Sequence, residues 1–373
     1  MLLSLTLWLS LANAAEVTDM APGPGVLVGM HYGGSSLRGD LMEQETVVSG
    51  RRVLRHDLDL RAELAPVEGI ALTLGLDTTP AWVFRYPDAR EMTVEPANSE
   101  GSYLAGNPFD EDPAIRASGL RGVWVGAAVA PFAERYERAS APTTWRLDVA
   151  YRTGNKNRNL WTASDGRRGA APGGSALLLS GAFSTDMGIG TPYMKVAWQR
   201  EGAVEVDVVD EEGREWAKNL ALRPASDLSI RSGVEILAYE EPEENSTFSF
   251  DLYLGGGYRT WEDIASGVYL PSVLGSSRQI PITVGDHMMG LAGVGIDYHV
   301  NEFVRGRSGL EFRYRTPFRP EHAYDVTTSA NTWELGWSLT IQGVAKFTGV
   351  EPASAPPPTT GATLPASGPP ASP

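Results

Sequence analysis

The sequence predicts an all-β fold, a transmembrane antiparallel up-and-down β-barrel of about twelve strands, with fourteen strands as the alternative. Three observations predict it. Apolar residues recur at every second position in many segments, and charged residues often occupy the positions between them. The connections between these segments alternate between long and short. Beyond its first residues the chain has no run of roughly 18 apolar residues, which a membrane-spanning helix would need.

The alternation is clearest in LRHDLDLRAELAPVEGIALTLGLD, residues 54–77. Successive side chains of a strand point to opposite faces, so residues 54–64 form one apolar face and one charged face. The apolar face holds Leu54, His56, Leu58, Leu60, Ala62 and Leu64, and the charged face holds Arg55, Asp57, Asp59, Arg61 and Glu63. A soluble β-sandwich alternates in the same way, so length, flanks and repetition decide between the two folds.

Repetition of this pattern favours the barrel. Period-two segments give twelve expected strands, at 25–32, 53–64, 70–79, 121–130, 144–153, 175–184, 192–200, 227–239, 247–258, 287–298, 307–316 and 332–347. The connections 65–69, 185–191, 240–246 and 299–306 are short and 131–143 is moderate, whereas 33–52, 80–120, 154–174, 201–226, 259–286 and 317–331 are long. Short turns at one end and long loops at the other are typical of transmembrane barrels. The segment 203–223 either extends its flanking strands or hides a further hairpin, which would give fourteen strands.

Aromatic residues gather near the ends of the expected strands, as they do in the two girdles that bound a lipid-facing band. Those near short turns are Phe132, Trp145, Tyr193, Tyr239, Phe248, Tyr298 and Phe347. Those near long loops are Trp82, Phe84, Tyr151, Trp198, Tyr258, Tyr314 and Trp333. Core aromatics of a sandwich would lie in the middle of strands more often.

The two ends of the chain have a different composition. The start, MLLSLTLWLSLANAAEV, is typical of a secretory signal peptide, expected at residues 1–15, with the barrel at 16–347. Residues 348–373 are rich in Pro, Ala, Ser and Thr and are expected to be disordered, as either a passive tail or a docking peptide. The net charge of −15 argues against a nucleic-acid partner, and the absence of Cys excludes disulfides and thiolate metal sites.

The last expected strand, NTWELGWSLTIQGVAKF, alternates throughout and ends at Phe347. It resembles the C-terminal signature of Gram-negative outer-membrane β-barrel proteins, although residues 348–373 follow it here. The resemblance implies a location in the cell outer membrane, with Phe347 as a membrane-insertion signal for the barrel assembly machinery. It also implies short turns and tail in the periplasm, where a partner could bind the tail. The basic loop 154–174 could then contact lipopolysaccharide phosphates, or be merely soluble.

The charged faces of the expected strands supply the candidate site, because in a barrel they line the lumen. The candidates are Arg55, Asp57, Asp59, Arg61, Glu63, Arg146, Asp148, Arg152, Arg231, Glu235, Asp251, Glu311, Arg313 and Arg315. Mixed charge suggests cross-strand ion pairs. One hypothesis is a passive channel or transporter for small solutes, selected by these charges. The alternative is a lumen closed by interlocking pairs, in a non-conducting envelope anchor or adhesion component that acts through its loops or tail.

No pattern predicts an enzyme, a cofactor or a metal site. The five histidines are scattered, and the chain has neither a G-x-S-x-G elbow nor an H-E-x-x-H helix. His56 and His287 are the best candidates for the general base of a hydrolase at the membrane rim. Because no nucleophile accompanies either histidine at a recognisable spacing, we expect the protein not to be an enzyme.

Overall fold

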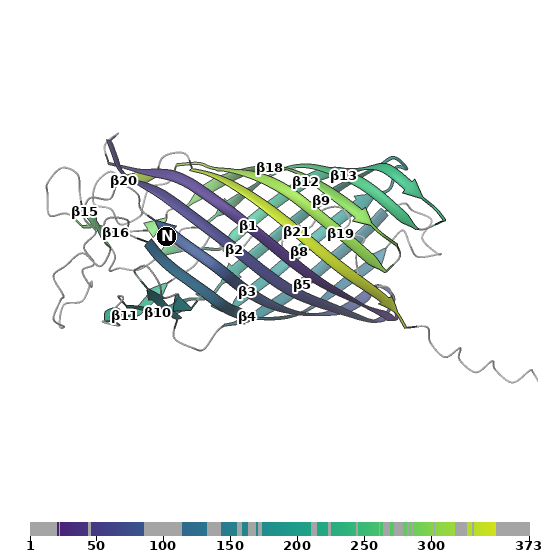
Figure 1. The fold of residues 1–373 in the computed structure, drawn as a ribbon, viewed down its shortest axis with the longest axis horizontal. Helices are drawn as coiled ribbons and strands as arrows, with labels where there is room; N and C mark the ends of the chain where they lie inside the picture. Colours follow the sequence, from purple (N-terminus) through teal and green to yellow (C-terminus); the bar gives the residue numbers. More distant parts are fainter. Residues whose placement is uncertain are drawn as a thin grey trace, which may run out of the picture.

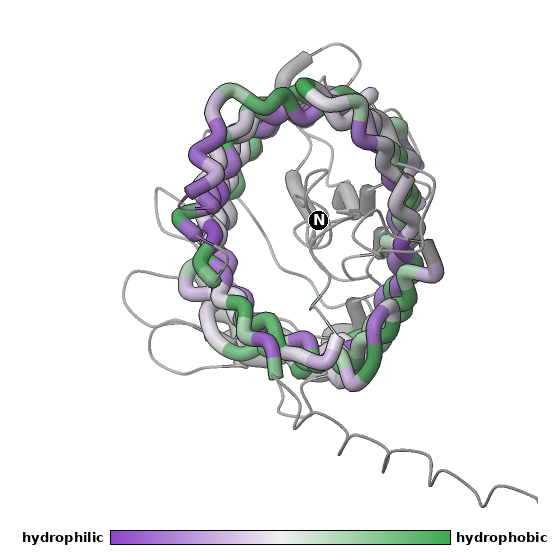
Figure 2. Tube along the Cα trace, turned by 90° about the vertical axis from the view of Figure 1, so that its right-hand side faces the viewer, coloured by the Kyte–Doolittle hydropathy of each residue, from purple (hydrophilic) through white to green (hydrophobic). Residues whose placement is uncertain are grey.

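Twelve strands close into one antiparallel barrel in the computed structural model (Figure 1), which confirms the predicted fold class. The wall consists of β1 (Gly25–Glu43), β2 (Thr46–Val67), β3 (Ile70–Arg85), β4 (Ala114–Phe132), β5 (Thr143–Gly154), β8 (Ala176–Thr185), β9 (Gly190–Glu201), β12 (Asp227–Glu241), β13 (Ser246–Arg259), β18 (His287–His299), β19 (Val304–Arg315) and β21 (Thr332–Lys346). Neighbours in this order are paired, and β1 pairs with β21 to close the ring. Figure 2, a view along the barrel, shows the closed outline.

The structure describes residues 21, 23–43, 46–85, 114–132, 143–154, 159–162, 169–170, 174–209, 215–222, 225–243, 245–260, 262–263, 269–271, 279–281, 283–284, 286–301, 303–317, 327–329 and 332–347. The expected signal peptide, residues 1–15, and the expected tail, residues 348–373, lie outside the described residues. Within the described part of the chain, no helix is long and apolar enough to cross a membrane.

The outer face of the wall is apolar and the inner face is polar. On β3, Leu72 and Leu74 are 55% and 56% exposed, whereas Thr73 between them is only 9% exposed. The colouring of Figure 2 shows the same alternation of apolar and polar residues along the strands. A continuous band of exposed leucines is stable against lipid rather than water, and a closed barrel leaves no unpaired strand edge in the membrane.

The two ends of the barrel differ in their connections. At one end, here called the short-turn end, two to four residues separate β2 from β3, β8 from β9, β12 from β13 and β18 from β19. Between β2 and β3, Gly69 has a φ of 80°, a conformation that favours glycine. The opposite, long-loop end carries the remaining short strands, of which Figure 1 labels β10, β11, β15, β16 and β20 together. They are β6 (Asn159–Thr162), β7 (Gly169–Ala170), β10 (Val204–Val209), β11 (Glu215–Leu222), β14 (Glu262–Asp263), β15 (Tyr269–Pro271), β16 (Gln279–Pro281), β17 (Thr283–Val284) and β20 (Thr327–Ser329).

Two expectations about the connections were wrong. Residues 33–52 are not a long loop, because β1 and β2 remain paired from Gly25 opposite Ala65 to Glu43 opposite Thr46. This part of the ladder is rich in glycine and polar residues, so the sequence loses its apolar period while the backbone pairing continues. The fourteen-strand alternative is also wrong. The hairpin of β10 and β11 lies outside the wall, since β9 pairs directly with β12.

Two aromatic residues expected in the girdles face the lumen instead. Tyr193 is 3% exposed and Trp82 is 5% exposed. The register of β3 against β4 shifts between Thr79 and Trp82, around Pro80, and this irregularity changes the face to which later residues point. Tyr193 precedes the lipid-facing Met194, so its position near a turn was misleading. Exposed girdle residues include Trp145, Tyr151, Tyr239, Tyr258, Tyr298 and Trp333. The side chains of Phe84 and Phe132 lie outside the described residues.

Candidate functional site

All fourteen charged residues predicted from the sequence lie on the inner face of the barrel. Those that are buried are Arg55, Asp57, Glu63, Arg146, Arg152, Arg231, Asp251, Glu311, Arg313 and Arg315. The other four, Asp59, Arg61, Asp148 and Glu235, are partly exposed. The inner wall therefore contains a tightly packed set of charges and a few that solvent reaches.

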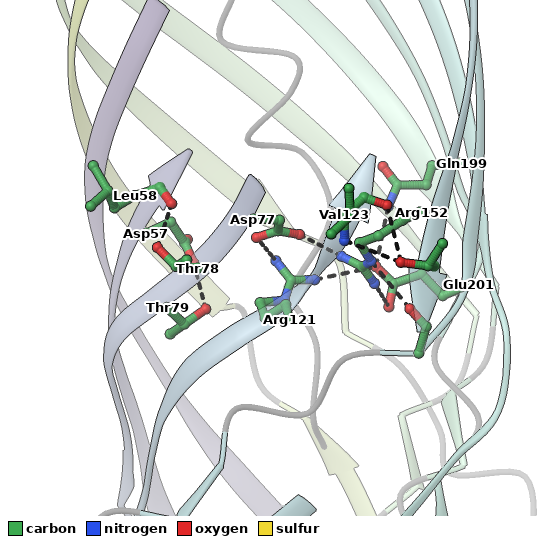
Figure 3. Close-up of polar contacts among 12 residues, drawn as sticks. Asp57, Leu58, Asp77, Thr78, Thr79, Arg121, Val123, Arg152, Gln199 and Glu201 are labelled. Atoms are coloured by element: carbon green, nitrogen blue, oxygen red, sulfur yellow. Dashed lines mark hydrogen bonds and ion pairs between the residues drawn. The ribbon is translucent and has the colours of Figure 1, made fainter. Parts of the chain in front are cut away.

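A ring of four side chains joins β3, β4, β5 and β9 (Figure 3). Arg152 is 1% exposed, and its Nη1 lies 2.7 Å from Oδ2 of Asp77 while its Nη2 lies 3.2 Å from Oε2 of Glu201. Arg121 completes the ring, with Nη1 at 3.1 Å from Oδ1 of Asp77 and Nη2 at 3.6 Å from Oε1 of Glu201. Two guanidinium groups thus neutralise two carboxylates, and each carboxylate contacts both. We call this set the ion-pair ring.

Three members of the ion-pair ring were missing from the predicted site. Asp77 ends the segment that showed the alternation most clearly, so its place on the polar face was readable. Arg121 and Glu201 lie where the expected strands border the adjoining loops, and β4 begins at Ala114, earlier than predicted. Arg121 is the first residue of the expected strand 121–130, and Glu201 follows the last residue of the expected strand 192–200, so neither was included among the charges of a strand face.

Beside the ring, β2 and β3 hold a separate pair. Arg55 contacts Asp57 through Nε at 2.6 Å and Nη2 at 2.7 Å. Thr79 donates its hydroxyl hydrogen to Oδ1 of Asp57 at 2.9 Å. Both charged side chains are almost fully buried, so the carboxylate of Asp57 is neutralised locally.

A second group of charges joins β2 and β5 nearer the short-turn end. Nη2 of Arg146 lies 2.7 Å from both Oε1 of Glu63 and Oδ1 of Asp148. Nη2 of Arg61 lies 2.9 Å from the same oxygen of Glu63 and 3.8 Å from Oδ1 of Asp148. The side chains of Arg61 and Asp148 are 31% and 14% exposed, so this group is open to solvent on one side.

The other half of the inner wall, from β12 to β21, carries a chain of alternating charges. Nη2 of Arg231 lies 2.6 Å from Oε2 of Glu311, and Arg313 also contacts Glu311. Nη1 of Arg313 lies 3.9 Å from Glu334, whose other oxygen lies 2.6 Å from Arg315. Glu311 and Glu334 are thus neutralised by neighbouring arginines.

Two tyrosines cross this half of the wall above glycines. Tyr193, Gly233, Tyr253 and Gly293 are paired in one row across β9, β12, β13 and β18. The hydroxyl of Tyr193 donates to Oδ1 of Asp251 at 3.0 Å, two strands away. The hydroxyl of Tyr253 donates to Glu311 at 3.0 Å, also two strands away. The glycines leave room for the rings, and the rings fill the lumen along this wall.

A cavity of about 120 Å³ lies in the lumen against the first half of the wall. Polar side chains of β1, β2, β3, β5, β8, β9, β19 and β21 line it, together with the apolar Trp124 and Leu178. The charged and polar lining includes His31, Asp59, Arg61, Asp148, Lys195 and Thr340. Three of the four partly exposed charges, Asp59, Arg61 and Asp148, therefore line a hollow, together with the buried pair of Glu63 and Arg146.

At the short-turn end an apolar layer adjoins this cavity. It consists of the buried residues Ala21, Leu27, Ala65, Ala71, Ala128, Ala130 and Val344. The backbone N–H of Ala21 donates to Oε2 of Glu63 at 3.4 Å. The chain just before β1 thus lies inside the barrel, in contact with the group around Arg61.

Known proteins resemble this chain in structure only. No protein-family model and no curated protein matches it. Similar solved structures include the COG4313 outer membrane channel from Pseudomonas putida F1, at 12% identity and a TM-score of 0.49, over 88% of this chain and 98% of that one. The P. putida toluene transporter TodX has 9% sequence identity and a TM-score of 0.38, over 90% of this chain and 93% of that one. The translocator domain of the autotransporter NalP from Neisseria meningitidis has 9% sequence identity and a TM-score of 0.40, over 87% of this chain and 91% of that one.

The closed wall and its lipid-facing band, with inward charges, decide the class of protein. The chain has the fold of an outer-membrane β-barrel. Phe347, predicted as its insertion signal, is 52% exposed at the end of β21, and its backbone N–H donates to the carbonyl of Pro24 at 3.0 Å. The roles of the assembly machinery, lipopolysaccharide and a periplasmic partner stay predictions.

The two histidines considered as bases lie on opposite faces of the barrel wall. His56 lies on the outer face, with its ring 6.0 Å from that of Tyr32 and 6.1 Å from that of Trp337. His287 is 3% exposed on the inner face of β18. The structure does not bring them together. Among the residues that the structure describes, no group of three or more His, Asp or Glu side chains could hold a metal ion.

Proposed function

We propose that this outer-membrane β-barrel is a channel or transporter that lets small polar solutes cross the outer membrane. The observation that carries the proposal is the cavity in the lumen, lined by charges of both signs that solvent reaches. A structural wall alone would be satisfied by the buried pairs. The exposed side of Arg61 and Asp148 instead supplies groups that a passing solute can contact.

The buried ion pairs support a narrow path rather than a wide aqueous pore. A barrel of this strand number lies between those filled by side chains and those with an open channel. The ion-pair ring and the two tyrosines lie on the inner face of the wall and are held by mutual contacts. Such a path would restrict passage by size, and its charges would act on solutes at short range.

Single-channel conductance of the purified, refolded protein in a planar bilayer tests the proposal. We expect steady conductance in the wild type. Arg61→Gln removes one positive charge from the cavity, so its reversal potential in a KCl gradient should shift towards cations. Arg52→Gln is the matched control, because Arg52 is exposed on the outer face of the same strand and should leave selectivity unchanged.

Silence of the wild type, with folding confirmed, would overturn the channel proposal. That result would favour the second candidate, a non-conducting envelope anchor or adhesion component. The observation in favour of this candidate is the near-complete burial of most inward charges in pairs, as at Arg152 and Glu311. Equal reversal potentials for wild type and Arg61→Gln would instead remove Arg61 from the solute path.

A further inference from the structure

Asp59 differs from the other carboxylates around it. It lies in the middle of β2 and faces the cavity. Asp57 and Asp77 are each held by arginine, at 2.6 Å and 2.7 Å respectively. Among the described residues, no hydrogen bond or ion pair reaches the carboxylate of Asp59.

The charges around Asp59 do not balance. Those that act on it most strongly are Asp57 and Asp77, which repel its charge, and Arg55 and Arg121, which attract it. Arg55 is engaged by Asp57, and Arg121 belongs to the ion-pair ring. This neighbourhood therefore holds four carboxylates, Asp57, Asp59, Asp77 and Glu201, and three guanidinium groups, Arg55, Arg121 and Arg152. Asp59 is the carboxylate of this group that no guanidinium contacts. The cavity that it faces is also lined by Arg61, Arg146, Lys195 and Arg307, of which Arg61 and Arg146 contact Glu63 and Arg307 contacts Asp297.

The surface around Asp59 has a definite chemistry. Asp59 is paired with His31 on β1, and His31 is paired in turn with Thr340 on β21. The hydroxyl oxygen of Thr340 lies 2.8 Å from Nδ1 of His31. The same cavity has an apolar side, where Trp124 and Leu178 line it. A carboxylate without a partner, facing a cavity with an apolar side, suits a ligand that has one positive group on a small apolar body.

We infer that the cavity binds small organic cations, with the positive group at Asp59 and the apolar part against Trp124 and Leu178. This inference rests on the proposed function and names its solute class. Bound there, a cation gives Asp59 the charged partner that Asp57 and Asp77 already have in arginine, and Asp59 becomes the residue that selects cationic over neutral solutes. The partly exposed position of Asp59 lets the ligand exchange with the lumen.

Block of the K⁺ current by benzylammonium, measured in a planar bilayer, tests the inference. Wild type should be blocked by benzylammonium but not by benzyl alcohol, its neutral analogue. Asp59→Asn should raise the half-blocking concentration about tenfold, because the cation loses a carboxylate partner at little cost in volume. Glu235→Gln is the matched control. It removes the same charge from the inner face of β12, outside the lining of the cavity, and should leave block unchanged.

Three results would overturn the inference: no block of the wild type, equal block of Asp59→Asn and wild type, or equal loss in Asp59→Asn and Glu235→Gln. If Asp59→Asn does not fold, Leu178→Trp replaces it, since it fills the apolar side of the cavity and keeps every charge. It should weaken block, and unchanged block would count against the site. If the wild type does not conduct, calorimetric titration of the detergent-solubilised protein with benzylammonium separates the two proposals. Binding of benzylammonium would then contradict the channel proposal and support the cation site, whereas absence of binding would contradict both proposals.

Discussion

The two halves of the inner wall use the same kinds of side chains and leave different amounts of space. From β9 to β19, Tyr193 and Tyr253 lie in a row with Gly233 and Gly293, and the rings occupy the space above the glycines. From β1 to β4, no tyrosine lies over the inward-facing Gly75, which instead has the Cβ of Trp124 at 3.4 Å from where its own Cβ would be. The cavity lies above this second region. The lumen is thus filled where a tyrosine ring lies over Gly233 or Gly293, and hollow near Gly75, where no tyrosine does.

The ion pairs of the two halves also differ in their redundancy. In the ion-pair ring, Asp77 and Glu201 depend on the same two arginines. In the other half, Glu311 accepts from an arginine on each side and from the hydroxyl of Tyr253. Buried pairs contribute little over apolar packing, but loss of one partner leaves an uncompensated charge. The two halves should therefore respond differently to loss of one arginine.

Arg152→Met, in the half of the wall that holds the ion-pair ring, should reduce stability more than any other change considered below. The substitution keeps an unbranched stem but removes the guanidinium, so Arg121 is the one arginine left for Asp77 and Glu201, and Glu201 also keeps the amide of Gln199 at 3.1 Å. We expect a loss of about 3–5 kcal/mol in the free energy of unfolding. Urea unfolding of the protein refolded in lipid vesicles, followed by tryptophan fluorescence, measures it.

Arg231→Met provides the comparison for that measurement. Arg231 is 4% exposed and lies 4.3 Å from the ring centre of Tyr253, so it is as enclosed as Arg152. Its partner Glu311 keeps both Arg313 and Tyr253, and we expect a smaller loss, about half that of Arg152→Met. Equal losses would show that the redundancy of partners does not distinguish the two halves.

The barrel could be predicted from the sequence because lipid outside the wall and water inside it require apolar and polar residues to alternate along each strand. In segments such as 54–64 and 145–151, every second residue must be apolar against lipid, and this shows directly in the letters. Above the membrane no such demand exists, and there the prediction failed. The paired stretch of β1 and β2 beyond Gly33 has the same backbone geometry but no apolar period, so it was expected to be a loop.

The inward charges could be predicted as a set, but not their partners. The alternation of side chains along the strand places Arg152 on the inner face. Its contacts with Asp77 and Glu201 depend instead on the register between strands that are far apart in the sequence. Tyr193 shows the same limit, because proximity to a turn suggested a girdle position while its parity and an opposing glycine place it in the lumen. A cavity depends on the volumes of residues on several strands together, so no single segment encodes it.

Gly233→Ala should disturb the filled half at its most crowded point. A Cβ at this position would lie 2.6 Å from Cζ and Oη of Tyr193, so the ring must move and its hydrogen bond to Asp251 must lengthen. We expect a loss of about 1–3 kcal/mol in the same unfolding measurement. Tyr193→Ala combined with Gly233→Ala should cost less than the sum of the two single changes.

The control for this prediction is Gly290→Ala on the outer face of β18. Nothing lies within 4 Å of a Cβ added there, so the change should alter stability by less than about 0.5 kcal/mol. A large effect at Gly290, or additivity of the Tyr193 and Gly233 changes, would mean that the contact between ring and glycine is not the cause.

Arg61→Gln should show how little the hollow half depends on the charges at its edge. The side chain of Arg61 is 31% exposed, and Glu63 and Asp148 both keep Arg146 at 2.7 Å after its removal. We therefore expect a loss of less than about 1 kcal/mol in the free energy of unfolding, as for exposed ion pairs. A loss as large as that of Arg152→Met would place Arg61 among the groups that hold the wall together. A small loss, together with the shift in reversal potential expected for this variant, would separate the charges that stabilise the barrel from those that face a solute.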